Sequence, residues 1–352
     1  MKKFLVLSFS FSLFALSFTL NCYADFNDYL DYLGKERGHF GVKSENTLGA
    51  GEKFFIGGDI NDLGTSIKAL AEKKPFLSEK QTIGIEAGAA FLDDKRYKQE
   101  TPVIGAYVYT DMDEYTRFSS EIKYSQPEIY HVSDAADERI KKHVGSNSVS
   151  ALLFRCENSP VDNDDYPTSG RKTDMAFEVS SQALGSDFNF LRLTAGNAFY
   201  YTPVELNNPL SRLTFAFIQQ AGFMNRFAGD DEIPFFERFY AGGTTTVRGY
   251  MPRYLGPRDK DDEPIGGNCM AAWTLEARYP VWKDIKAALF YDQGNAWEKT
   301  ADLNLNDTKS GVGAGLRWVT RFGTARLDYG YGLNGNTRQR GGRVHAGLGM
   351  RF

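Results

Sequence analysis

Hydrophobic and polar residues alternate along most of the chain, from about Gly38 to the last residue. Successive side chains of a β-strand point to opposite faces, so an alternating stretch predicts a strand with one apolar and one polar face. The clearest apolar sets are Ile83, Ile85, Ala87, Ala89 and Phe91; Trp273, Leu275, Ala277 and Tyr279; Ile285, Ala287, Leu289 and Tyr291; and Val344, Ala346, Leu348, Met350 and Phe352. Polar turns separate these stretches, which predicts an all-β chain.

Strand length bears on what covers the apolar face. In a soluble β-sandwich that face meets a second sheet, whereas in an outer-membrane barrel it meets lipid and the polar face lines the lumen. Many segments reach about 9–11 residues, enough to cross a bilayer at a tilt, and closure into a barrel pairs the strand edges that lipid cannot satisfy. We therefore predict a transmembrane antiparallel β-barrel of about 16 strands, an even number as in single-chain bacterial barrels.

The N-terminus has the pattern of a secretory signal peptide. Two lysines after Met1 precede an uncharged apolar run from Phe4 to Leu20, and Cys22-Tyr23-Ala24 supplies the small residues that signal peptidase reads. We expect residues 1–24 to be the signal peptide, 25–37 a short polar segment and 38–352 the barrel domain. The alternative for the first segment is a membrane anchor of borderline length.

Composition restricts the possible functions more than it restricts the possible folds. Aromatic residues make up 14% of the chain and glycine contributes 35 residues, which suits tight turns and an aromatic girdle but also a soluble sandwich. The formal net charge of −4 argues against nucleic acid binding. Cys156 and Cys269 remain after the signal peptide, and we expect two free thiols because they fall near opposite ends of the predicted barrel. The four histidines lack the spacing of metal ligands.

One stretch departs from the alternation. The aromatic-rich segment 235–240 is followed by Ala-Gly-Gly-Thr-Thr-Thr-Val-Arg-Gly-Tyr at 241–250. Gly242 and Gly243 allow the backbone to turn sharply at positive φ, and Arg248 stands among apolar and small residues. Taken alone, the stretch could also be an exposed loop with a solvated arginine.

The stretch resembles the long sixth extracellular loop of the BamA/TamA superfamily of outer-membrane assembly barrels, also called the bacterial surface antigen family. The motifs that follow are in the family's order: Leu255-Gly256-Pro257-Arg258, Gly266-Gly267-Asn268, a strand with Glu276, Tyr291-Asp292-Gln293-Gly294, and a strand that ends at Phe352. The resemblance implies a long extracellular loop folded into the lumen. The segment 25–37 is too short for a POTRA domain, so the resemblance is to a form lacking these periplasmic domains.

Arg248 should have acidic partners, because an unpaired arginine inside a barrel would be costly. Glu276 and Asp292 fall on the inward face by the alternation, and the resemblance implies the same pair. We expect Arg248 to bridge to both, with Val247 and Tyr250 packed on the inner wall. Gly242, Gly243 and Gly249 would then permit close backbone approach. The alternative is that both acids simply line a solvated lumen.

The last strand carries a second expectation from the resemblance. Gly347, Leu348, Met350 and Phe352 match the pattern by which the assembly machinery recognises its clients, with small inward residues and a terminal aromatic. The alternative is an ordinary lipid-facing strand. Inward glycines are also compatible with the weakly paired seam between first and last strands that family members have.

The resemblance implies a role in outer-membrane protein insertion or polypeptide translocation, in the outer membrane of a Gram-negative-type bacterium. Expected partners are outer-membrane lipid and lipopolysaccharide, the assembly machinery, and client proteins or a separate periplasmic partner. The alternative is a passive surface-antigen barrel or narrow pore. We expect no enzyme activity, cofactor or metal, because no nucleotide, metal or nucleophile–base motif occurs.

Overall fold

The computed structural model describes residues 40–45, 51–60, 64–164, 166–203, 212–229, 232–320, 323–335 and 341–348. The expected signal peptide and short N-terminal segment lie outside these residues, so the predicted boundaries at 24 and 37 remain predictions. Met350 and Phe352 also lie outside them.

The described residues form seventeen strands in one sheet. Their bounds are β1 Phe40–Glu45, β2 Glu52–Ile60, β3 Gly64–Lys73, β4 Gln81–Asp94, β5 Tyr97–Asp111, β6 Thr116–Ser125, β7 Glu128–Tyr130, β8 Gly145–Ser146, β9 Val149–Asn158, β10 Gly170–Ser180, β11 Phe190–Tyr201, β12 Thr214–Arg226, β13 Cys269–Trp282, β14 Ile285–Trp297, β15 Lys309–Thr320, β16 Gly323–Gly332 and β17 Gly342–Leu348. The helices are short: α1 Glu138–Lys141 and the 3-10 turns η2 Gln182–Leu184, η4 Phe235–Glu237, η5 Thr300–Asp302 and η6 Leu305–Asp307.

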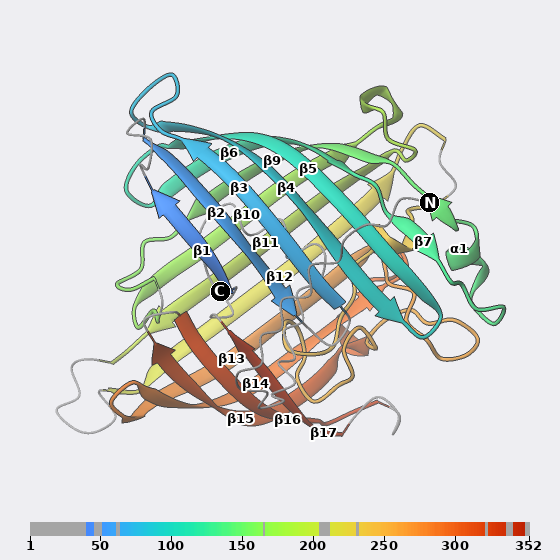
Figure 1. Cartoon of the computed structure of the whole chain (residues 1–352). Coiled ribbons are helices and arrows are strands. Elements are labelled where there is room, and N and C mark those ends of the chain that lie inside the picture. Colours follow the sequence, from blue (N-terminus) through green and yellow to red (C-terminus); the bar gives the residue numbers. More distant parts are fainter. Residues whose placement is uncertain are drawn as a thin grey trace, which may run out of the picture.

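Neighbours in sequence are neighbours in the sheet. Strands β1 to β6 form consecutive antiparallel pairs, and β6 then pairs with β9. From β9 to β17 each strand again pairs antiparallel with the one that follows it. The short strands β7 and β8 pair with each other, and β7 also pairs with β5 beside the wall. Figure 1 shows the wall strands wrapped around a common interior, with α1 and β7 at one end. The predicted antiparallel barrel of about 16 strands is confirmed.

The two faces of the wall have opposite polarity. On β4, Ile85 is 61% exposed on the outside, whereas its neighbour Glu86 is 7% exposed on the inside. Leu289 of β14 is 64% exposed, whereas Asp292 is fully buried. A soluble sandwich would bury the apolar face, so this pattern excludes the sandwich and fits a wall that faces lipid. Similar exposed residues on other strands are Phe54, Ile67, Ile104, Ile122, Phe177, Leu193, Phe215, Leu275, Leu316 and Val344.

Three long connections, including the two longest, lie at the end of the barrel that carries α1. They comprise residues 126–148, 227–268 and 298–308, and long loops of outer-membrane barrels are extracellular. No helix in the described part of the chain is long and apolar enough to cross a membrane. Cys156 and Cys269 are both free thiols, as predicted.

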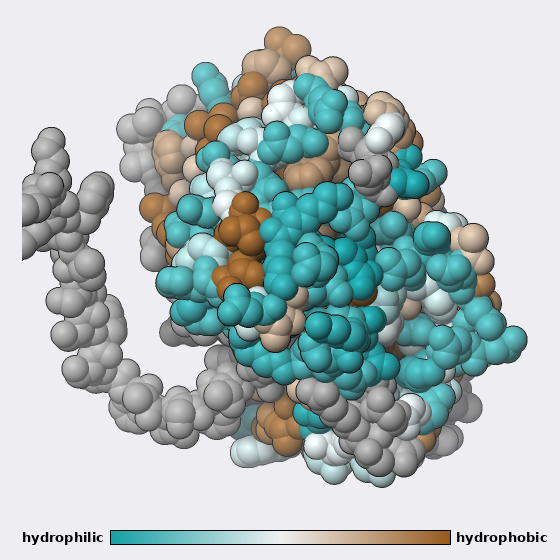
Figure 2. Space-filling view, turned by 90° about the vertical axis from the view of Figure 1, so that its right-hand side faces the viewer, coloured by the Kyte–Doolittle hydropathy of each residue, from teal (hydrophilic) through white to brown (hydrophobic). Residues whose placement is uncertain are grey.

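A hydrophobic core closes the extracellular end. It combines residues from β5, β7, α1, β9, β11 and β12 with residues of the 227–268 connection. We call it the cap core: Tyr97, Ile129, Ala136, Ile140, Val149, Phe190, Met224, Ile233, Phe235, Phe236 and Phe239. The ring of Tyr97 meets Phe235 edge-on at 5.0 Å between centroids. Figure 2 faces the side on which α1 lies, where mostly hydrophilic residues cover the surface.

Candidate functional site

The segment 227–268, which we call the lumen loop, leaves β12 and returns to β13. Its two limbs meet where Phe239 and Gly267 exchange backbone hydrogen bonds of 2.8 Å in each direction. Beyond this point the chain turns tightly. The Gly243 N–H donates to the Val247 carbonyl at 3.1 Å, and the Gly242 N–H donates to the Thr246 hydroxyl at 2.7 Å.

Glycine at 249 is required by both conformation and space. Its φ is +91°, a left-handed value that costs other residues strain. A Cβ atom there would lie 2.5 Å from the backbone nitrogen of Gly332, so the loop lies directly against the end of β16. Gly242 and Gly243 also have positive φ, of 100° and 92°. The structure thus gives all three predicted glycines a conformational reason.

Arg248 is a deeply enclosed charged side chain of the loop, with 1% of its surface exposed. Its Nε and Nη2 donate to the two carboxylate oxygens of Asp292, each at 2.8 Å. Its Nη1 donates at 3.2 Å to Glu276 and at 3.2 Å to Asp328. The Arg248 backbone N–H also donates to Asp292, at 3.0 Å. Both carboxylates expected from the sequence contact the guanidinium, and Asp328 on β16 is a third that was not anticipated.

Two further arginines complete a charge-balanced cluster on the inner wall. Arg278 donates from Nε to Glu276 at 2.8 Å, and Arg317 donates to Glu276 at 3.0 Å and to Asp328. The lumen cluster therefore comprises three arginines and three carboxylates, namely Arg248, Arg278, Arg317, Glu276, Asp292 and Asp328. All six are buried, and mutual pairing offsets the cost of removing them from water.

Apolar and hydroxyl groups hold the residues around Arg248. The guanidinium lies 3.3 Å from the ring centroid of Phe290, within cation–π distance. Val247 and Tyr250 are fully buried, and the Tyr250 hydroxyl donates to the Ser310 carbonyl at 2.9 Å. The Gly249 N–H faces Nε2 of His345 on β17 at 3.4 Å. The loop thus contacts the wall from β13 to β17.

A turn from the other end of the barrel reaches the same cluster. The turn at 162–170, which joins β9 to β10, brings the ring of Tyr166 to 5.4 Å from the Arg278 guanidinium. Tyr200 lies at the same distance from this guanidinium. Asp162 fixes the turn by accepting from the backbone N–H groups of Thr168 at 2.8 Å and Ser169 at 3.0 Å. The interior is therefore approached by loop residues from both ends.

The cluster residues that were not anticipated from the sequence nevertheless lie at inward positions of the alternating pattern. Inward positions are occupied by Asp328, Arg317 and Arg278. The sequence does not show, however, that their strands β16, β15 and β13 meet at the guanidinium of Arg248. Phe290 also faces inward. Because aromatic residues occur on both faces of the strands, the sequence did not indicate that this ring would stack on Arg248. Only the barrel register joins these positions.

The other predicted site lies on the last strand. Gly347 and Leu348 belong to β17, where they pair with Arg326 and Ala325 of β16. Their expected role as an assembly signal, together with Met350 and Phe352, remains a prediction. Among the described residues, no group of three or more His, Cys, Asp or Glu side chains is placed to hold a metal. The chemistry that the site supports is electrostatic fixation of a loop.

Comparison with known proteins places this architecture in one family. The Omp85 superfamily domain matches residues 46–352. The outer membrane protein assembly factor BamA of Nitratidesulfovibrio vulgaris is 29% identical over 245 residues, which cover 68% of this chain and 30% of that protein. BamA of Neisseria meningitidis is 25% identical over 303 residues, covering 73% and 37% respectively. BamA of Neorickettsia risticii is 26% identical over 310 residues, covering 83% and 40%.

Solved structures show the same fold. BamA from Haemophilus ducreyi lacking POTRA domains 1–3 superposes with a TM-score of 0.72 at 17% identity, over 89% of this chain and 68% of that one. CdiB from Escherichia coli gives a TM-score of 0.61 at 12% identity, over 88% and 57%. The chain spans between 30% and 40% of the length of the curated relatives above. With its family domain, its wall and its lumen loop, this chain belongs to the Omp85 superfamily and is an outer-membrane β-barrel of Gram-negative bacteria.

Proposed function

We propose that this barrel takes part in inserting other β-barrel proteins into the outer membrane, or in moving polypeptides across it. The relatives above carry the name outer membrane protein assembly factor, and CdiB shares the fold. The proposed partners are outer-membrane lipid, unfolded client barrels, the assembly machinery and a separate periplasmic partner. No nucleotide or metal step enters the proposal.

The observation that carries the proposal is the ionic attachment of the lumen loop. Arg248 contacts carboxylates on β13, β14 and β16, and this attachment is buried. A pore for free diffusion needs an open interior, whereas here a loop with a charged cluster occupies it. A loop fixed to several neighbouring strands can hold that part of the wall in one arrangement while other strands move.

Depletion of the protein tests the assembly role. We expect the abundance of several other outer-membrane barrels to fall, measured by quantitative mass spectrometry of isolated outer membranes. Complementation with Arg248→Gln should restore little of this abundance. Lys98→Ala, which removes an exposed ion pair with Asp93, is the matched control and should restore it fully. An unchanged proteome after depletion would instead support the passive barrel.

Site-specific crosslinking tests for clients. A photoreactive residue in place of Val344 on β17 would sit on the outer face of the last strand, where Val344 is 58% exposed. Leu289 on β14 is similarly exposed in the middle of the wall and serves as the control. We expect newly exported barrel proteins to crosslink to position 344 and not to position 289. Equal crosslinking at both positions would indicate lipid-phase collisions rather than client handling.

Conductance in planar bilayers addresses the pore alternative. A lumen filled by the loop should give a low and rarely fluctuating conductance in the wild-type barrel. A stable, large conductance would support the narrow-pore reading and contradict the occupied lumen.

A further inference from the structure

Two consecutive residues, Glu237 and Arg238, fasten the start of the lumen loop in different directions. They follow the cap-core rings of Phe235 and Phe236 and directly precede Phe239, where the two limbs of the loop meet. Both charged side chains are buried, with 2% and 3% of their surfaces exposed. We call residues 232–239 the neck and residues 244–250 the tip.

Glu237 attaches the neck to β10 and β11. Arg192 on β11 donates from Nη2 to the Glu237 carboxylate and, at 2.8 Å, to the Glu237 backbone carbonyl. Its Nη1 donates at 2.7 Å to Glu178 on β10. One buried guanidinium therefore joins the loop and two wall strands, a geometry that resembles the arrangement around Arg248.

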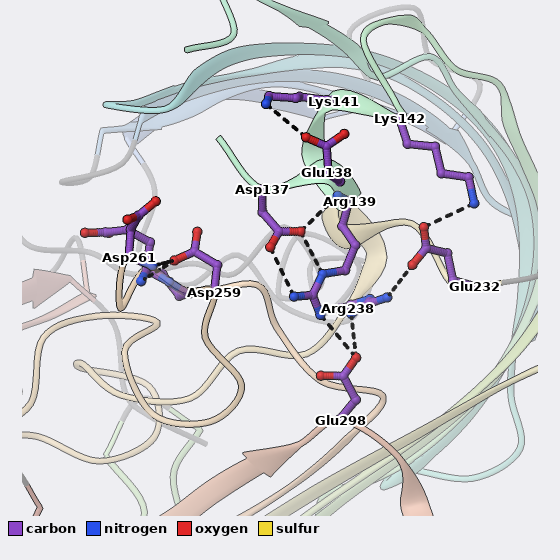
Figure 3. Close-up of polar contacts among 12 residues, drawn as sticks. Asp137, Glu138, Arg139, Lys141, Lys142, Glu232, Arg238, Asp259, Asp261 and Glu298 are labelled. Atoms are coloured by element: carbon purple, nitrogen blue, oxygen red, sulfur yellow. Dashed lines mark hydrogen bonds and ion pairs between the residues drawn. The ribbon is translucent and has the colours of Figure 1, made fainter. Parts of the chain in front are cut away.

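Arg238 attaches the neck to the connection that follows β14. Its Nε donates to the Ile233 carbonyl at 2.9 Å, and its Nη1 lies 3.5 Å from Glu298. Its Nη2 donates to Glu232 at 3.4 Å. Figure 3 shows Arg238 between Glu232 and Glu298, with Arg139 of α1 reaching the same Glu298 carboxylate. The neck is thus held from both sides of the extracellular rim.

The neck contacts are separate from the lumen cluster. Within the described residues, none of the ion-pair partners of Glu237 and Arg238 is also a partner of Arg248. The tip lies against β12 to β17, where Gln220 of β12 donates to the Thr245 carbonyl at 2.6 Å, whereas Glu237 lies against β10 and β11. Interactions that are well separated in space and share no partners contribute to stability almost independently.

We propose that Glu237, with its wall partner Arg192, is a second positioning site that holds the neck of the lumen loop independently of Arg248. Release of the tip from its carboxylates then leaves the extracellular cap closed, so that the deep part of the loop can move without opening the barrel to the exterior. The functional meaning of this arrangement rests on the proposed assembly role, but the positioning itself can be measured on the isolated barrel.

Hydrogen exchange of the purified barrel in lipid nanodiscs, resolved by peptide, tests the independence. In Arg192→Gln we expect backbone amides of the neck to exchange faster by about tenfold or more, as loss of a hydrogen bond between charged groups implies, with the tip unchanged. Arg248→Gln should give the reverse pattern. Glu237→Gln repeats the test from the loop side and leaves the Arg192–Glu178 pair in place.

Lys123→Gln is the matched control. Lys123 lies 4.0 Å from Glu178 on the wall and belongs to the same group of charges, but it makes no contact with the neck among the described ion pairs. It should leave neck exchange unchanged. The proposal is wrong if Arg192→Gln and Glu237→Gln leave the neck unchanged, or if each loosens the tip as much as the neck. Because the readout requires no client, loss of the assembly role would not affect this outcome.

Discussion

Replacing Arg248 by glutamine should release the tip of the lumen loop while the barrel stays folded. The substitution keeps part of the aliphatic stem but removes the guanidinium that lies over Phe290, its charge and four side-chain hydrogen bonds to Asp292, Glu276 and Asp328. Adding up four separate bonds would overstate the effect, because water and the remaining arginines take over part of the pairing. Breaking a buried ion pair from one side costs about 3–5 kcal/mol.

That cost predicts the size of the measurable change. At about 1.4 kcal/mol per tenfold, the equilibrium between attached and released tip shifts by roughly two to four orders of magnitude. Hydrogen exchange at the amides of residues 247–250 should accelerate by a comparable factor, up to the rate of a free loop. The amide N–H groups of Arg248 and Gly249 are suitable reporters, since both face acceptors on the wall.

A second arginine of the lumen cluster is the control. Arg278 also pairs with Glu276 and is also buried, but it contacts wall and turn residues rather than the lumen loop. Arg278→Gln should therefore accelerate tip exchange far less than Arg248→Gln. If the two variants loosen the tip equally, the tip is held by the charge balance of the cluster and not by the direct contact of Arg248 with its carboxylates. If Arg248→Gln leaves the tip protected, the reasoning fails altogether.

Four further outcomes follow from single positions. Asp328→Asn should loosen the tip in the same exchange assay, but by only about 1–3 kcal/mol, because one of three carboxylates is neutralised. Gly249→Ala should destabilise the tip strongly through its clash with β16, whereas Gly229→Ala, at a similar φ of +89° but in open space, should cost only about 1–2 kcal/mol by denaturant titration. Burial among three phenylalanine rings lowers the pKa of His143, so the contribution of this side chain to cap stability is complete above about pH 6.5 and is lost as pH falls through the pKa of the folded state. The cap amides should therefore open more readily at pH 5.5 than at pH 7.5. His143→Gln should remove this difference. Leu289→Arg should lower folding stability in lipid vesicles by up to about 2–4 kcal/mol, and no effect would contradict its contact with lipid.

The alternating pattern predicted the wall because each strand can be recognised from its own residues. Ile85 and Glu86 are adjacent in sequence and on opposite faces, and the same local rule applies on every strand. Periodicity does not reveal whether the apolar side meets lipid or another sheet. Strand length and the signal-peptide pattern of the N-terminal residues favoured lipid, and the exposed apolar outer face agrees.

The site was predicted in part, for a related reason. Glu276 and Asp292 could be named because they lie on inward positions of the two strands that follow the loop. Asp328 and Arg317 occupy inward positions too, but their distance from Arg248 depends on the register of three further ladders. The second attachment of the loop had no sequence signal at all, since Glu178 and Arg192 precede it by dozens of residues and look like ordinary lumen-lining charges.

The amino-acid sequence by itself determined the strands, their two-sided polarity and the glycine-rich stretch 241–250 with its single arginine, because these depend on residues within a few positions of each other. Only the assembled, curved sheet decided which distant charges meet. Curvature of the wall brings β10, β11, β13, β14 and β16 around one interior, and a buried charge must then pair with whichever opposite charge the register presents. The contacts that fix the loop are therefore a property of the barrel, although every residue in them can be read from the chain.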